Sequence, residues 1–136
     1  MDALNFVKDM DIEKYSAVFA VGGDGIIHEV INGIMRREDK KKIPVGLIPN
    51  GSGNDTVGGF QIDNIKEAMQ YVCKGDTVKV DVTKCLMDVE SEEEITGDPA
   101  KHIRYSIVNS CLCLSANVNK NAARWKPFFG SQCYSI

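Results

Sequence analysis

AVFAVGGDGIIHEVINGI, residues 17–34, is the stretch that decides the fold. The apolar run over 16–21 is typical of a strand that is buried on both faces, as in a parallel sheet. It breaks at GGDG, residues 22–25. Apolar side chains then recur every three to five residues over 25–37, which predicts a helix with one buried stripe. A strand, a glycine-rich turn and a helix are therefore expected in succession.

The same arrangement occurs again further along the chain. PVGLIP at 44–49 predicts a second short buried strand, and NGSGND at 50–55 forms a second glycine-rich turn. Helices are predicted over 2–14 and over 62–75, the second stopped by Gly75. The side chains predicted to face inward on this second helix are Ile65, Ala68, Met69 and Val72. A strand-helix-strand order predicts an α/β fold with an open, mostly parallel sheet.

The pattern changes after about residue 80. The segment 76–90 is rich in valine and threonine, which predicts one long strand or two short ones, and the segment 102–115 alternates in polarity, which predicts another long strand. We therefore divide the chain into an α/β domain over 1–80 and the start of an all-β domain over 81–136. Both domains are expected to be incomplete.

Composition limits the classes of function. The 136 residues are 43% hydrophobic, and the formal net charge is −3. The chain therefore has no overall positive charge that would favour binding of nucleic acid. No apolar run reaches the ~20 residues that span a bilayer, and no segment resembles a targeting peptide. The five cysteines include no CxxC pair, so free cytosolic thiols are expected rather than disulfides or zinc ligands.

Both glycine-rich turns follow predicted strands, at the sheet edge where open parallel sheets bind ligands. GGDG leads into a helix N-terminus, whose unpaired N–H groups and dipole favour a phosphate. The second turn adds a hydroxyl and an amide as possible donors to a nucleotide. Ordinary turn chemistry explains one such cluster equally well, but two together favour a site. Neither matches the dinucleotide fingerprint or the P-loop, so the residues alone indicate a nucleotide or phosphate site.

Asp24 needs a separate explanation, because a carboxylate beside a phosphate is unfavourable without a role. It could hold Mg²⁺, accept a proton from an attacking hydroxyl, or fix the turn. The residues by themselves leave these three roles open.

GGDGIIHEVINGI followed by PVGLIPNGSGNDT resembles the lipid kinases that phosphorylate diacylglycerol, sphingosine and ceramide. NAD kinases share GGDG but not PNGSGND. The resemblance implies that ATP binds between an α/β domain and a β-sandwich lipid domain, and that its γ-phosphate passes to a lipid hydroxyl with Mg²⁺. It also implies a cytoplasmic protein that contacts membranes peripherally. Oligomeric state is not predicted.

The resemblance also assigns residues. Asp24 becomes the expected catalytic base, with Glu29 and Asn32 bracing the glycine turns and Asp55 bracing the second turn. His28 is expected to be an ordinary polar helix residue near the phosphates rather than a catalytic histidine. The expected nucleotide contacts are Gly22, Gly23, Asp24, Gly25, Ile26, Ile27, His28, Gly51, Ser52, Gly53 and Asn54.

Several positions depart from the family pattern. Ile26 stands where many relatives have threonine. Asn117 and Asn119 replace acidic residues that recognise a sphingoid amine, which disfavours a free sphingoid base. Lys126 keeps a positive charge, whereas Cys133 stands where arginine is usual. The two asparagines and Lys126 are the candidate lipid or substrate contacts, and no metal ligands are expected within the chain.

The leading hypothesis is a fragment of an ATP-dependent lipid kinase. It begins after the family's first strand and ends before the sandwich is complete, so the isolated chain is expected to be inactive. The alternative is a non-catalytic nucleotide-binding or regulatory fragment. The lipid, whether diacylglycerol, ceramide or a sphingoid base, is left open.

Overall fold

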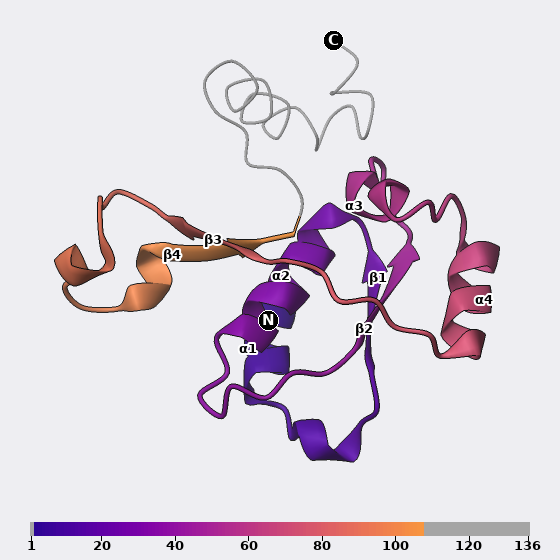
Figure 1. Cartoon of the computed structure of the whole chain (residues 1–136), viewed down its shortest axis with the longest axis horizontal. Coiled ribbons are helices and arrows are strands. Elements are labelled where there is room, and N and C mark those ends of the chain that lie inside the picture. The colour runs from indigo at the N-terminus through magenta and orange to yellow at the C-terminus, as the bar shows by residue number, and fades with distance from the viewer. Residues whose placement is uncertain (1, 108–136) are drawn as a thin grey trace, which may run out of the picture.

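The computed structural model describes residues 2–107 of this chain. Two small sheets and several short helices make up this range (Figure 1). The elements in chain order are α1 (Ala3–Asp9), the 3-10 helix η1 (Ile12–Lys14), β1 (Val18–Gly22), α2 (Asp24–Met35), β2 (Val45–Pro49), α3 (Asp55–Gly59), α4 (Ile65–Lys74), β3 (Thr83–Leu86), the 3-10 helices η2 (Glu92–Glu94) and η3 (Pro99–Lys101), and β4 (Ile103–Ser106).

The parallel pair β1 and β2 confirms the α/β prediction. Val18 lies opposite Val45 and Gly22 lies opposite Pro49, so both strands end at the same edge. The core beside the pair comes from α1, α2, α3, β1 and the connecting segments. Its buried members are Val7, Ile12, Ala20, Ile27, Val30, Ile34, Ile43 and Val57. This arrangement places the two glycine-rich turns side by side.

The prediction that β1 is buried on both faces is wrong for the described residues. Ala20 faces the core and is 1% exposed, whereas Phe19 and Val21 on the opposite face are about half exposed. The Phe19 ring lies over Gly46 of β2, where a Cβ would overlap it. Strand β1 therefore has only one covered face in the described structure, the face that carries Ala20 and that α2 helps to cover.

Helix α1 packs tightly on α2. A Cβ on Gly33 would lie 2.6 Å from the carbonyl oxygen of Leu4, so only glycine permits this approach. The buried Arg37 donates to the carbonyls of Val7, Lys8 and Met10 and so caps the end of α1. The predicted single helix over 2–14 is therefore wrong: Met10 is extended, and a 3-10 turn capped by Asp11 follows.

The predicted helix over 62–75 is confirmed as α4. The Asn64 side chain accepts from the Glu67 N–H at its start, and Gly75 ends it at φ 71°. Ala68 is buried as expected, but Ile65 and Met69 are 50% and 44% exposed. Helix α4 contacts β2 through a narrower stripe than its apolar pattern predicts.

The second half of the described chain contains less strand than expected. Only β3 forms within the predicted strand over 76–90, because residues 76–82 lie in no described sheet. β4 pairs with β3 in antiparallel register, Thr83 opposite Ser106. The predicted strand over 102–115 and the all-β domain over 81–136 extend outside the described residues. Helix α2 lies between this hairpin and the parallel sheet (Figure 1).

Candidate phosphate-binding site

The two glycine-rich turns touch each other backbone to backbone. The Asn50 N–H donates to the Gly22 carbonyl at 2.9 Å, which extends the β1–β2 pairing into the turns. A Cβ on Gly51 would lie 2.9 Å from the Gly23 nitrogen and overlap its Cα, and one on Gly23 would lie 3.1 Å from Gly51 Cα. Any side chain at either position would push the turns apart. Glycine is therefore required at position 51, whereas a Cβ at position 23 would need a small shift of the facing backbone.

The first turn presents the N-terminus of α2 without a side-chain cap. Gly23 is the extended N-cap residue, and a Cβ on Gly25 would meet no atom within 4 Å. The N–H groups of the first helical turn lack intrahelical acceptors, so such an end attracts an anion. Ser52 and Gly53 of the second turn are also exposed. This open edge, rich in hydrogen-bond donors, has the chemistry of a phosphate-binding site.

The structure does not bring every predicted contact to this edge. The Ile26 and Ile27 N–H groups donate to the Gly23 carbonyl at 3.1 and 3.3 Å, which closes the first helical turn. The Ile27 side chain is 1% exposed and belongs to the core. Ile26 instead presents its side chain to solvent. The backbone N–H groups that stay open for a ligand are therefore those that precede Ile26.

Asp24 bridges the two turns. Its Oδ1 accepts the backbone N–H of Thr56 at 2.8 Å and the Thr56 hydroxyl at 2.6 Å, and its Oδ2 accepts the Asp55 N–H at 3.3 Å. Asn54, the N-cap residue of α3, makes no side-chain cap bond, so Asp24 supplies the cap from another helix. Of the three roles that the sequence allows, fixing the turn has direct geometric support.

These bonds also set the acidity of Asp24. Burial raises the pKa of this carboxyl, but the hydrogen bonds from Thr56 and Asp55 together lower the pKa below its ordinary 3.8. Asp24 is therefore ionised at neutral pH. Thr56, which is 3% exposed, escaped the sequence-based assignment although it directly follows the GND triplet.

Asn54 closes the second turn upon itself. Its Oδ1 accepts the Gly51 N–H at 2.9 Å, and its Nδ2 donates to the Gly51 carbonyl at 2.9 Å. The backbone of Asn54 is left-handed at φ 61°, a conformation that asparagine tolerates better than most residues. The amide of Asn54 therefore braces the loop, and its predicted nucleotide contact stays a prediction.

Glu29 and Asn32 do not brace the glycine turns, contrary to the sequence-based expectation. Glu29 Oε2 accepts the Ala3 N–H at 2.6 Å and so caps α1. Asn32 bonds to the backbone of Tyr105 in β4. Both residues face elements that are distant in sequence, which the helical spacing of the motif does not reveal.

His28 lies one turn into α2 near the surface, and the partly buried side of its ring lies 3.4 to 3.5 Å from Asn32 Nδ2. Partial burial lowers the pKa of His28, and the nearby Arg104 and Arg36 lower it further. The imidazole is therefore less readily protonated than a free one.

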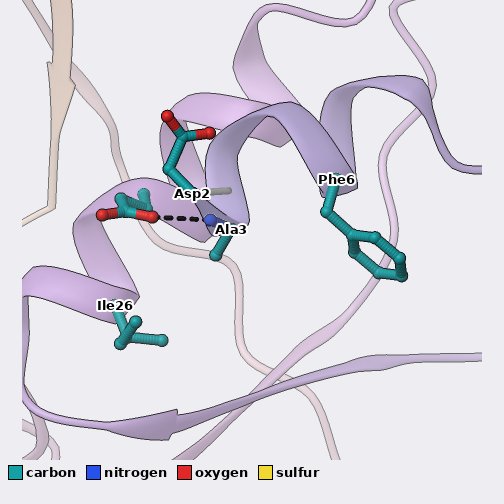
Figure 2. A pocket seen from close by; sticks show the side chains of 5 residues that line it. Asp2, Ala3, Phe6 and Ile26 are labelled. Atoms are coloured by element: carbon teal, nitrogen blue, oxygen red, sulfur yellow. Dashed lines mark hydrogen bonds between the residues drawn. The ribbon is translucent and has the colours of Figure 1, made fainter.

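A hollow of about 740 Å³ lies beside the first turn of α2 (Figure 2). Asp2, Ala3, Phe6, Ile26 and Glu29 line it. The Phe6 side chain is 60% exposed at its edge. Neither Asp24 nor Thr56 lines the hollow, and its two carboxylates, Asp2 and Glu29, already cap α1. Its polar groups are thus occupied by the fold.

Within residues 2–107, no cluster of three or more histidine, cysteine or acidic side chains could hold a metal ion. No helix in this same range is long and apolar enough to cross a membrane. The candidate substrate residues Asn117, Asn119 and Lys126, and the departure at Cys133, lie outside the described residues.

Several known proteins that are similar to this chain are lipid kinases. The chain is 34% identical to "Sphingosine kinase 1" of Arabidopsis thaliana over 62% of its own length and 17% of that protein. It is 38% identical to "Acylglycerol kinase, mitochondrial" of Xenopus laevis over 52% of the chain and 19% of that protein. Identity to "Diacylglycerol kinase" of Staphylococcus aureus is 38%, over 53% of the chain and 22% of that protein. The matches thus cover about a fifth of these curated relatives.

The match to a family model covers the part of the chain that builds the site. The model of the diacylglycerol kinase catalytic domain matches residues 1–85, which contain both glycine-rich turns, the parallel strands and the Asp24–Thr56 bridge. It spans more than half of the 136 residues. This chain therefore belongs to the diacylglycerol kinase catalytic domain family, a family of lipid kinases.

Proposed function

We propose that this chain is the nucleotide-binding part of an ATP-dependent lipid kinase that transfers the γ-phosphate of ATP to a lipid hydroxyl. The observation that carries the proposal is the contact between two glycine-rich turns at one sheet edge, with the open N-terminus of α2 between them. The relatives' names share a lipid substrate but differ in which lipid it is. The class of acceptor is thus a lipid hydroxyl.

The donors at the two turns hold the phosphates. Backbone N–H groups of Gly23 and Gly25 contact them from the first turn, and Ser52 and Gly53 contact them from the second. When bound, ATP supplies the phosphoryl group and Mg²⁺ neutralises its charge. Donors fixed by backbone geometry need little rearrangement as charge develops on the transferring group.

Asp24 has two functions in this proposal, one for each carboxylate oxygen. Oδ1 accepts both bonds from Thr56 and positions the second turn. Oδ2 accepts one longer bond from Asp55, at 3.3 Å, and keeps capacity for a further partner. This oxygen accepts the proton of the attacking lipid hydroxyl. Asp55 braces the turn through its N–H.

The domain organisation follows the same proposal. Residues 1–80 form the nucleotide-binding domain, and residues 81–136 begin a β-sandwich domain that binds the lipid. The β3–β4 hairpin, which α2 holds beside the parallel sheet, supports this division. A lipid acceptor places the protein at a membrane surface, peripherally and on the cytoplasmic side.

The second candidate is a nucleotide-binding unit without catalytic turnover. The observation that favours it is the Asp24 carboxylate itself, which already accepts three hydrogen bonds and has a lowered pKa. A carboxylate of this kind is a weaker base than a free one.

A chimera separates the two candidates. Residues 1–85 of this chain would replace the matching segment of the Arabidopsis thaliana sphingosine kinase 1, and transfer of labelled γ-phosphate to sphingosine, diacylglycerol and ceramide in vesicles would be measured. The lipid kinase proposal predicts retained turnover. A folded chimera that binds ATP without turnover supports the non-catalytic candidate, and one that does not bind ATP contradicts both. The isolated chain is expected to bind ATP weakly without turnover.

A further inference from the structure

The buried amide of Asn32 pairs with β4 as a neighbouring strand would. Its Nδ2 donates to the Tyr105 carbonyl at 2.8 Å, and its Oδ1 accepts the Tyr105 N–H at 3.0 Å. Both backbone groups of one strand residue are thus satisfied by one side chain, the pattern of a hydrogen-bonded pair in an antiparallel sheet. The two residues are 73 positions apart, and Asn32 is 0% exposed.

Arg36 continues this contact one helical turn later. Its guanidinium donates to the carbonyls of Ile103 at 2.8 Å and Ala100 at 3.4 Å. Residues four apart on a helix share a face, so Asn32 and Arg36 form one polar edge along α2. On its other side β4 pairs with β3. We call this set of bonds from Asn32 and Arg36 to the β4 region the α2–β4 clamp.

The clamp supplies specific polar contacts between the hairpin and the α/β part. The buried members of the main hydrophobic cluster lie between Val7 and Val57, and among the described residues after α3 only Ile62 and Ile107 pack against this cluster as partly buried side chains. Apolar contacts tolerate sliding, whereas two opposed hydrogen bonds to one residue fix both distance and register. The placement of β4 therefore depends on polar geometry.

The clamp also connects this placement to the phosphate turn. Helix α2 begins at Asp24, and Asn32 lies eight residues later, about 12 Å along a rigid helix. We propose that Asn32 is a positioning residue that sets the β3–β4 hairpin, and any lipid-binding surface built on it, at a defined distance from the phosphate turn. The effect of this positioning on phosphoryl transfer rests on the proposed function. The α2–β4 clamp itself does not depend on that function.

The test uses the full 136-residue chain, isotopically labelled, with and without Mg·ATP. Amide exchange at Tyr105 reports whether the clamp bond is present, and residual dipolar couplings report the orientation of β4 relative to α2. Asn32→Ala removes both bonds, and Arg36→Met removes the second contact while keeping an apolar stem. Glu29→Gln is the matched control, because it alters a polar residue of α2 that faces α1.

The expected result for Asn32→Ala is a roughly tenfold faster exchange at Tyr105 and a reoriented hairpin, while the α2 amides keep their protection. Arg36→Met should produce a smaller change of the same kind, and Glu29→Gln none at β4. Unchanged exchange and orientation in both α2–β4 variants would overturn the proposal. If Asn32→Ala unfolds the chain, the exchange at Tyr105 and the hairpin orientation in Arg36→Met decide whether the proposal holds.

The ATP titration keeps this result separate from the proposed function. Suppose that Asn32→Ala reorients the hairpin and binds ATP with an affinity within about threefold of the original chain. This result supports the positioning role of Asn32, because the phosphate turns are then undamaged. Absence of ATP binding by the original chain counts against the proposed function and leaves the exchange result to decide the clamp.

Discussion

The Thr56 hydroxyl donates to Oδ1 of Asp24 at 2.6 Å, across 32 residues of sequence. This bond ties the first turn of α2 to the first turn of α3 and so connects the two glycine-rich loops. Because Thr56 also donates its backbone N–H to the same oxygen, one carboxylate oxygen holds the start of a second helix.

Removing this hydroxyl should change both the acidity of Asp24 and the stability of the fold. In Thr56→Val we expect the pKa of Asp24 to rise, since one of the bonds that lower it is lost. The free energy of unfolding should fall by about 1.5 kcal/mol, the scale of a hydrogen bond to a charged group. A carbon-detected titration of the Asp24 carboxyl and urea unfolding measure the two effects.

Thr56→Ser is the control for this change, because it keeps the hydroxyl and loses only a methyl group. Its Asp24 pKa should stay as low as in the original chain. Equal Asp24 titration in the valine and serine variants would show that the hydroxyl bond does not set the acidity.

Asp24 should also make stability depend on pH in the acid range. Its folded pKa lies below the ordinary 3.8, so its contribution is complete above that pH and is lost as the pH falls through the folded value. Asp24→Asn lacks this titration. Urea unfolding of both proteins from neutral pH to below 3.8 should give a stability difference that shrinks in acid. A difference that is constant with pH would contradict the assigned shift.

The contact between the turns predicts opposite outcomes for two glycine substitutions. In Gly51→Ala the new Cβ would meet the backbone of Gly23, so we expect a loss of about 1–3 kcal/mol in stability and of ATP binding. Gly58→Ala adds a Cβ that meets no atom within 4 Å and improves helix propensity in α3. Calorimetry measures the thermal stability and the ATP affinity of both variants. Equal stability and equal affinity would show that the contact between Gly51 and Gly23 is unimportant.

The base role of Asp24 is tested in the chimera with Asp24→Asn. If Oδ2 accepts the proton of the lipid hydroxyl, turnover should fall by about 10²–10⁴ while ATP affinity is retained. Asn keeps an oxygen that can accept both bonds from Thr56, so this part of the contact between the turns is kept, although the bond from the Asp55 N–H is lost. Turnover equal to that of the unmodified chimera would remove Asp24 from the base role.

Much of the site's framework could be predicted from the sequence because it depends on local patterns. Apolar runs ending at GGDG and at NGSGND predict two strands followed by turns, and both lie where expected, at one edge of a parallel pair. Gly75 ends α4 as predicted, because a C-terminal cap involves only a few neighbouring residues. β3 is shorter than the composition of 76–90 predicts, since valine and threonine favour a strand only where a partner strand supplies hydrogen bonds.

What the sequence by itself determined is the order of strands, turns and helices and the family's paired glycine motifs, because periodicity and turn chemistry act over a few residues. Only the tertiary structure decided the partners of the polar side chains. Asp24 bonds to Thr56, Glu29 to Ala3, and Asn32 to Tyr105, each across 26 to 73 residues. A hydrogen bond requires two groups within about 3 Å in a suitable direction, and no spacing along one helix specifies what lies opposite it.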